Sequence, residues 1–141
     1  MNKFIYFIKI FIKSKKKFLL PIQCEILLYD KINYENFKDI LINKKISLLH
    51  CRGESINIII LIFSIFTLPY YKRNLKFCYF INYIKISKPK FLITFFDNNI
   101  FFYKLSTYLN NHSKIKTISY QNGLRQANLN DIFEIAKPKY K

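Results

Sequence analysis

The scarce residues of this chain mark the positions where its chemistry is expected. Glycine occurs twice, at Gly53 and Gly123, and two of the three arginines, Arg52 and Arg125, lie within two residues of these glycines. An arginine side chain presents a planar set of donors that binds phosphate or carboxylate. Glycine lets the backbone approach a ligand or adopt a positive φ. The two positions therefore predict binding of an anionic group.

Acidic and amide side chains occur at the same places and at one further turn. The candidate substrate-binding residues are Arg52, Gly53, Asn98, Asn99, Gln121, Asn122, Gly123 and Arg125. Glu54 and Asp97 are the candidate catalytic carboxylates, because a general base must accept the proton of a substrate hydroxyl. Asp30 is a third carboxylate in a similar position.

Each candidate also has a purely structural interpretation. Asp or Asn between a strand and a helix commonly caps the helix. Arg52 and Glu54 could pair with each other in a solvated contact of little energetic value. Asn122 and Gly123 could form only a tight turn. It is the convergence of four such segments that favours a ligand site.

The elements that must position these residues are short apolar runs that alternate with helical patterns. The expected strands cover residues 26–29, 46–51, 91–96 and 115–120, and one candidate segment follows each of them. The expected helices cover residues 34–43, 55–71 with a turn at Pro69, a segment from Asn74 to Lys88, and a segment around Phe101, Leu105 and Leu109. This order predicts an α/β fold, a Rossmann-like parallel sheet of about four strands with helices on both faces. All strands of such a sheet end at one edge, where a ligand crevice is expected.

Composition limits the classes of protein to be considered. The chain has 141 residues, enough for one domain, and 51% of them are hydrophobic, which excludes a largely disordered chain. The net charge is +16, but 21 of the 24 cations are lysine, a residue with A/T-rich codons like the abundant Ile, Asn, Phe and Tyr. Part of the +16 net charge therefore reflects the A/T-rich coding sequence and not a function of the protein. No aromatic–basic RNA-binding signature and no helix-turn-helix order occurs, so no specific nucleic acid is expected as a partner.

The three cysteines, Cys24, Cys51 and Cys78, include no C-x-x-C pair. An odd number argues against a secreted disulfide framework and favours reduced thiols in the cytoplasm. A zinc site would have to recruit a histidine, but His50 and Cys51 are adjacent in an expected strand and would point to opposite faces. We therefore expect neither a metal nor another cofactor in this chain.

Residues 1–20 are predicted to form a basic amphipathic arm, separate from an α/β domain over residues 21–141. In a helix, Tyr6, Lys9, Lys13 and Lys16 would share one face, and apolar side chains would form the other. This pattern is typical of a helix that lies on an anionic membrane surface. A helix that packs on the domain with its lysines at the solvent edge is the alternative.

Residues 55–71 contain no charged side chain and are at the lower length limit for a membrane span. Asn57, Ser64, Thr67 and Pro69 weaken the stretch as a span. A helix buried against the sheet is therefore the favoured interpretation, and a membrane span is the alternative.

Three blocks of the chain resemble the bacterial surface carbohydrate biosynthesis proteins, in the same order and spacing. They are residues 48–57 (LLHCRGESIN), 88–99 (KPKFLITFFDNN) and 118–125 (ISYQNGLR). That family is similar to glycosyltransferases with two Rossmann domains, the GT-B-like type. The resemblance covers the N-terminal half of such a protein. It implies that this domain holds the acceptor and that a nucleotide-sugar donor binds only to a C-terminal domain, which is absent from this chain.

The function expected from the sequence is therefore acceptor binding within a glycosyltransferase-like protein of surface polysaccharide biosynthesis. The expected acceptor is a glycan or lipid-linked glycan at the inner face of the cytoplasmic membrane. The isolated chain is expected to be inactive, because the departing diphosphate needs stabilising groups from the second domain. The alternative is a non-catalytic basic protein that binds RNA or an anionic membrane surface.

Overall fold

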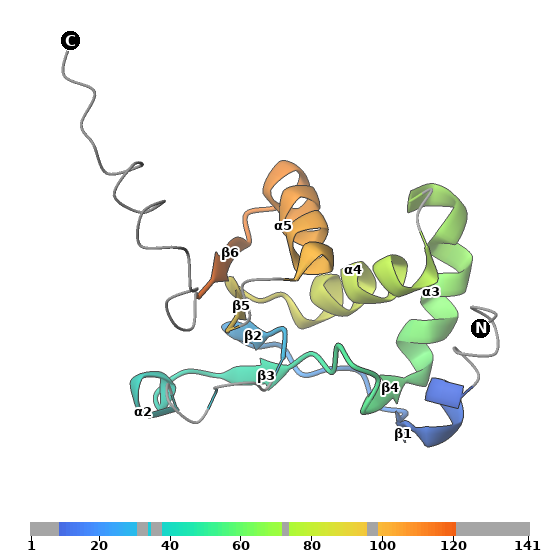
Figure 1. Cartoon of the computed structure of the whole chain (residues 1–141), viewed down its shortest axis with the longest axis horizontal. Helices are drawn as coiled ribbons and strands as arrows, with labels where there is room; N and C mark the ends of the chain where they lie inside the picture. Colours follow the sequence, from blue (N-terminus) through green and yellow to red (C-terminus); the bar gives the residue numbers. More distant parts are fainter. Residues whose placement is uncertain (1–8, 31–33, 35–37, 72–73, 96–98, 121–141) are drawn as a thin grey trace, which may run out of the picture.

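The computed structural model describes residues 9–30, 34, 38–71, 74–95 and 99–120 (Figure 1). A four-stranded sheet has the order β3 (Ile46–Leu48), β2 (Ile26–Leu28), β5 (Phe91–Thr94), β6 (Lys116–Ser119). All three pairings are parallel, and Ile26 of β2 is in register with both Ile46 of β3 and Phe91 of β5. The predicted α/β fold with a Rossmann-like parallel sheet is confirmed. Each observed strand is shorter than its apolar run.

Helices cover both faces of the sheet because the side chains of β2 alternate between two cores. Leu27 points into the larger core, which α4 (Leu75–Ser87) and α5 (Ile100–His112) share. Ile26 and Leu28 point into a smaller core with Leu41, the last residue of the short helix α2 (Lys38–Leu41). A strand that is apolar at every position is therefore buried on both sides, as the continuous apolar runs predicted.

The ends of α4 and α5 follow from their capping residues. The Asn74 Oδ1 atom accepts a hydrogen bond from the Phe77 backbone N–H at 2.9 Å, as predicted for a cap of α4. At the other end, Lys88 adopts a left-handed conformation with φ 46°, and its N–H bonds to the Ile84 carbonyl. Pro89 follows and prevents the helix from continuing, also as predicted.

A second, two-stranded parallel sheet is the feature that the sequence did not reveal. It pairs β1 (Lys15–Lys17) with β4 (Ser55–Asn57). The prediction of a helical face that extends to Lys16 is wrong, because only residues 9–13 of the described part of the arm are helical. The Lys16 ammonium instead bonds to carbonyls at the end of that helix, Ile12 at 3.0 Å and Ser14 at 2.8 Å. Hydrogen bonds of β1 to β4 cross the predicted boundary at residue 20.

Helix α3 (Ile58–Tyr71) differs from the helix expected over residues 55–71 in its start, its end and its packing. Residues 55–57 are a strand, and Asn57 caps the helix by accepting a bond from the Ile60 N–H at 3.1 Å. Pro69 lies inside the helix, so the predicted turn there is wrong. The helix packs on α4 rather than on the sheet (Figure 1).

The packing of α3 leaves one of its sides exposed, so the expectation of a buried helix is also wrong. Among the described residues, no single helix has both the length and the hydropathy to cross a membrane. α3 and α4 meet that test only as a pair, and the pair is bent by 114° at the break between them.

Candidate functional site

The carboxyl edge of the four-stranded sheet is the candidate site. The chain leaves β2 toward β3 on one side and leaves β5 toward β6 on the other, so the connections diverge between β2 and β5. In open parallel sheets, ligands bind outside the carboxyl ends of the strands at such a switch point. Here Asp30, after β2, is 5% exposed, and its Oδ2 atom accepts a hydrogen bond from the Thr94 hydroxyl of β5 at 3.1 Å. This contact ties the two central strand ends together.

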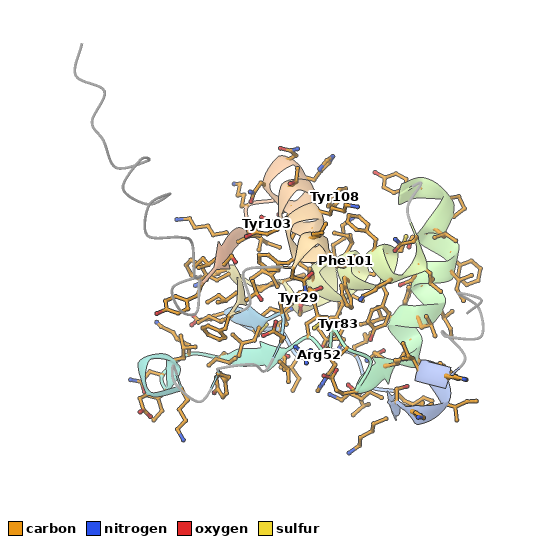
Figure 2. The ribbon with its side chains drawn as sticks, in the orientation of Figure 1. Tyr29, Arg52, Tyr83, Phe101, Tyr103 and Tyr108 are labelled. Atoms are coloured by element: carbon orange, nitrogen blue, oxygen red, sulfur yellow. The ribbon has the colours of Figure 1, made fainter. Side chains whose placement is uncertain are left out.

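Tyr29 lies under the edge, next to Asp30, and is almost fully buried. Its ring makes edge contacts with Phe80 of α4 and Phe102 of α5, with centroid distances of 5.9 Å and 5.3 Å. Figure 2 shows Tyr29 between the sheet and these helices. Burial raises the pKa of the phenol, and a hydrogen bond with the Asn99 side chain acts in the opposite direction. Tyr29 is therefore a neutral phenol that joins the core to the edge.

The segment after β3 brings charged side chains to the same edge. Burial raises the pKa of the Cys51 thiol to about 11, so the thiol is protonated near neutral pH. The carboxylates of Asp30 and Glu54 act in the same direction. Lys76 and Arg52 lower this pKa. The charges that act on this one thiol come from the end of β2, from the segment after β3 and from the first turn of α4.

Arg52 and Glu54 are both exposed, and in the described part of the chain they form no ion pair with each other. The structure therefore does not support the interpretation that Arg52 and Glu54 only pair with each other. Arg52 lies on the chain between β3 and β4 (Figure 2). Its guanidinium is available to an anionic group in solution.

Gly53 has a conformation that only glycine adopts readily, with φ +84°. A Cβ atom built on Gly53 would lie 2.5 Å from the Cγ2 atom of Ile10. The open face of this glycine is therefore covered by the N-terminal arm. The sequence predicted close approach of a ligand at this residue, and the close approach that is seen comes from Ile10.

The arm reaches a second residue of the same segment. The Lys17 ammonium lies 3.3 Å from His50 Nε2. Burial lowers the pKa of His50, and the Lys17 charge acts in the same direction, whereas Glu54 raises it. A neutral imidazole that accepts a hydrogen bond from the ammonium fits both observations.

Asn99 and Lys76 complete the edge from the helix side. Asn99 caps α5, with its Oδ1 atom 3.0 Å from the Phe102 N–H, so its structural interpretation holds alongside its contact with Tyr29. The Lys76 ammonium lies over the Phe101 ring, 5.0 Å from its centroid. The sequence analysis did not identify Lys76 as a candidate. Its position in the first turn of α4 could have indicated it, because a helix that leads into a parallel strand begins at the carboxyl edge of the sheet.

Six of the candidate residues lie outside the described part of the chain. They are Asp97, Asn98, Gln121, Asn122, Gly123 and Arg125. The described edge thus brings together Arg52, Glu54 and Asn99 of the predicted set, and adds Lys76. No group of three or more His, Cys, Asp or Glu side chains able to share a metal ion occurs within the described ranges. The three cysteines are free thiols, with Cys24 and Cys78 buried and Cys51 half-buried.

Comparisons of the chain with protein-family models, with curated proteins and with solved structures found no match.

Proposed function

We propose that this domain binds the acceptor of a glycosyltransferase reaction in bacterial surface polysaccharide biosynthesis. The acceptor is a glycan or lipid-linked glycan that carries a phosphate, met at the inner face of the cytoplasmic membrane. One observation carries the proposal. Two exposed cations, Arg52 and Lys76, act electrostatically on the Cys51 thiol after β3, as does Asp30, which Thr94 holds at the switch point between β2 and β5. The resemblance of residues 48–57 and 88–99 to the surface carbohydrate proteins supports the same function.

The chemistry of these side chains suits a phosphorylated sugar. The Arg52 guanidinium can form two parallel hydrogen bonds to a phosphate, and Lys76 adds a point charge. Glu54 is exposed and is the described carboxylate that we propose as the acceptor of a proton from a glycan hydroxyl. Asp97 is the second proposed carboxylate. The nucleotide-sugar donor would be held by a further domain.

A titration with hexose 1-phosphate, with the unphosphorylated hexose in parallel, tests this proposal. Binding is followed by calorimetry or by amide chemical shifts. Arg52→Ala and Lys76→Ala should each raise the Kd for the phosphate ester about tenfold, because a hydrogen bond to a charged group is worth about 1.5 kcal/mol or more. Lys114→Ala is the matched control, since this exposed lysine precedes β6 at the opposite edge of the sheet.

Two outcomes contradict the proposal. If the hexose binds as tightly as its phosphate ester, the cations do not recognise the ligand. If Arg52→Ala and Lys114→Ala weaken binding equally, and single-stranded RNA competes, the domain is a general polyanion binder. Competition by RNA that all lysine substitutions weaken alike would favour the alternative of a non-catalytic basic protein.

A further inference from the structure

Helix α3 carries large apolar side chains on the side that faces away from the protein, in addition to the apolar side chains, such as Ile60, that it buries in the core. It contains no charged residue, and Pro69 is its only helix-breaking residue. Its large exposed side chains recur at spacings of three and four, so they share one face of the helix. They are Ile62 (50% exposed), Phe63 (53%), Ile65 (55%), Phe66 (78%) and Tyr70 (79%). An isolated exposed isoleucine needs no explanation, but a contiguous apolar face marks an interaction surface.

Two polar side chains of α3, Ser64 and Thr67, contact α4. Ser64 is fully buried, and its hydroxyl donates to the Ile60 carbonyl at 2.6 Å. Asn82 of α4 is 8% exposed and donates to Ser64 Oγ at 3.3 Å and to Thr67 Oγ1 at 2.8 Å. A surface helix in water has a polar outer face, whereas the outer face of α3 is apolar like its inner face, where Ile60 is buried. Hydrogen bonds toward the neighbouring helix, and hydrocarbon on the outside, suit a helix whose outer side meets an apolar medium.

The segment after β1 is a second exposed apolar stretch, and it is bonded to the residue that precedes α3. β1 runs parallel to β4, in register from Lys15 with Ser55 to Lys17 with Asn57, and β4 leads directly into α3. The Leu19 carbonyl accepts a hydrogen bond from the Asn57 Nδ2 atom at 2.6 Å, which holds the segment beside the first turn of α3 (Figure 1). Four further side chains of this segment are large, apolar and at least half exposed. They are Phe18 (66%), Leu19 (85%), Leu20 (51%) and Ile22 (72%).

Exposed lysines precede the apolar segment 18–22 in the chain. Lys13 and Lys15 are exposed, at the end of the N-terminal helix and in β1, next to the apolar segment. Lys17 is exposed as well, because it points to the same side of β1 as Lys15. The only carboxylate in residues 9–22 or 54–71 is Glu54. An apolar face with a cationic border is complementary to a bilayer that contains anionic lipids, where lysines reach the headgroups and apolar side chains enter the acyl region.

We propose that the outer face of α3, with residues 18–22 and the bordering Lys13 and Lys15, docks on an anionic lipid bilayer. This face is hereafter the α3 surface. The sequence predicted membrane contact through a helical face of residues 1–20, whereas the α3 surface joins residues from two separate parts of the chain. The proposal is independent of acceptor binding, because none of its residues belongs to the carboxyl edge of the sheet.

The first test places a reporter in the α3 surface. The chain contains no tryptophan, so a single one gives an unambiguous signal. Phe66→Trp is expected to shift its emission to the blue, and to be quenched by lipids brominated on their acyl chains, in vesicles of phosphatidylcholine with phosphatidylglycerol. Ile100→Trp is the matched control, because Ile100 is 72% exposed but lies in α5. Equal quenching of both variants, or of neither, overturns the proposal.

The second test removes the attraction. In vesicle co-sedimentation, Phe66→Ser should lower the partition coefficient about tenfold, since burying a phenylalanine that is mostly exposed in water contributes most of the transfer free energy of its side chain. Lys13→Gln and Lys15→Gln should each lower it about fivefold in anionic vesicles only. Ile100→Ser and Lys114→Gln are the controls and should change nothing.

The remaining outcomes distinguish a lipid bilayer from a second copy of the chain as the partner of the α3 surface. The substituted side chains are exposed, so circular dichroism should show that the variants fold. If the chain self-associates in light scattering, and Phe66→Ser makes it monomeric while no vesicle binding occurs, a second copy covers the α3 surface and the proposal is wrong. If vesicles bind but Phe66→Ser binds them unchanged, the contact lies elsewhere and the proposal is equally wrong.

Discussion

Substitution of Gly53 by alanine tests whether the N-terminal arm is an integral part of the domain. Gly53 has φ +84°, and a Cβ atom there would lie 2.5 Å from Ile10 Cγ2. Two separate costs follow. The left-handed conformation costs an alanine about 1 to 2 kcal/mol. Forcing a methyl group against Ile10 adds about 1 to 3 kcal/mol, the usual range for overpacking. The free energy of unfolding should therefore fall by about 2 to 5 kcal/mol.

The contribution of the arm can be separated with a double-mutant cycle. Ile10→Ala removes the Cγ2 atom that the new methyl group would meet, whereas the backbone conformation of residue 53 stays the same. In the Ile10→Ala background, Gly53→Ala should therefore cost only the left-handed term, about 1 to 2 kcal/mol. Because the Cγ2 atom is attached to the stiff Cβ of an isoleucine, the arm cannot absorb the clash by rotating one flexible end.

Urea unfolding followed by circular dichroism measures all four members of the cycle. The coupling between residues 10 and 53 should be about 1 to 3 kcal/mol, equal to the overpacking term. A coupling near zero would refute the reasoning, because it would mean that Ile10 does not lie on Gly53 and that the arm is detached. An unchanged stability of Gly53→Ala itself would show that residue 53 does not hold a positive φ.

Two further predictions concern the inner side of α3 and the thiol at the sheet edge. Asn82→Ala should lower the free energy of unfolding, measured with urea, by about 2 kcal/mol. The reason is that two hydrogen bonds, to Ser64 and Thr67, are lost, each worth about 1 kcal/mol. A change below about 0.5 kcal/mol would mean that these bonds do not hold α3 on α4. The pKa of Cys51 is raised to about 11, so the stability that its buried neutral thiol provides is present below about pH 8.5, the unfolded value, and is lost as the pH rises through about 11. The rate of alkylation of Cys51, followed by peptide mass spectrometry, should rise over the same range, and Glu54→Gln should move the profile to lower pH while Arg52→Gln moves it to higher pH; identical profiles in both variants would show that neither charge lies near the thiol.

The four central strands could be predicted because their signal is local. A run such as residues 91–96 is apolar at consecutive positions, which is typical of a strand covered on both faces. The cap at Asn74 and the stop at Pro89 are local as well, since each depends on the hydrogen-bonding capacity of one residue. The observed strands are shorter than the apolar runs, although backbone bonds such as Tyr29 N–H to the Ile93 carbonyl at 2.8 Å continue the pairing one residue beyond a strand end.

The pairing of β1 with β4 could not be predicted. Three consecutive lysines have no preference for a strand, and Lys15–Lys17 become one because their backbone groups meet those of Ser55–Asn57. The same pairing gave the candidate site its unexpected neighbours, Ile10 on Gly53 and Lys17 on His50. Residues far apart in the chain met there, and no pattern within either segment indicated the contact.

The sequence by itself determined the α/β class, the positions of the central strands and the placing of Asp30, Arg52 and Glu54 after strand ends, because parallel strands all end at one edge. The tertiary structure alone decided which side of each apolar helix is covered. Phe66 and Ile60 lie in one apolar helix, yet the first is 78% exposed and the second is fully buried. The physical reason is that the exposure of a side chain depends on which other segments pack against it. Asn82 of α4 donates hydrogen bonds to Ser64 and Thr67, and this side of α3 therefore faces α4.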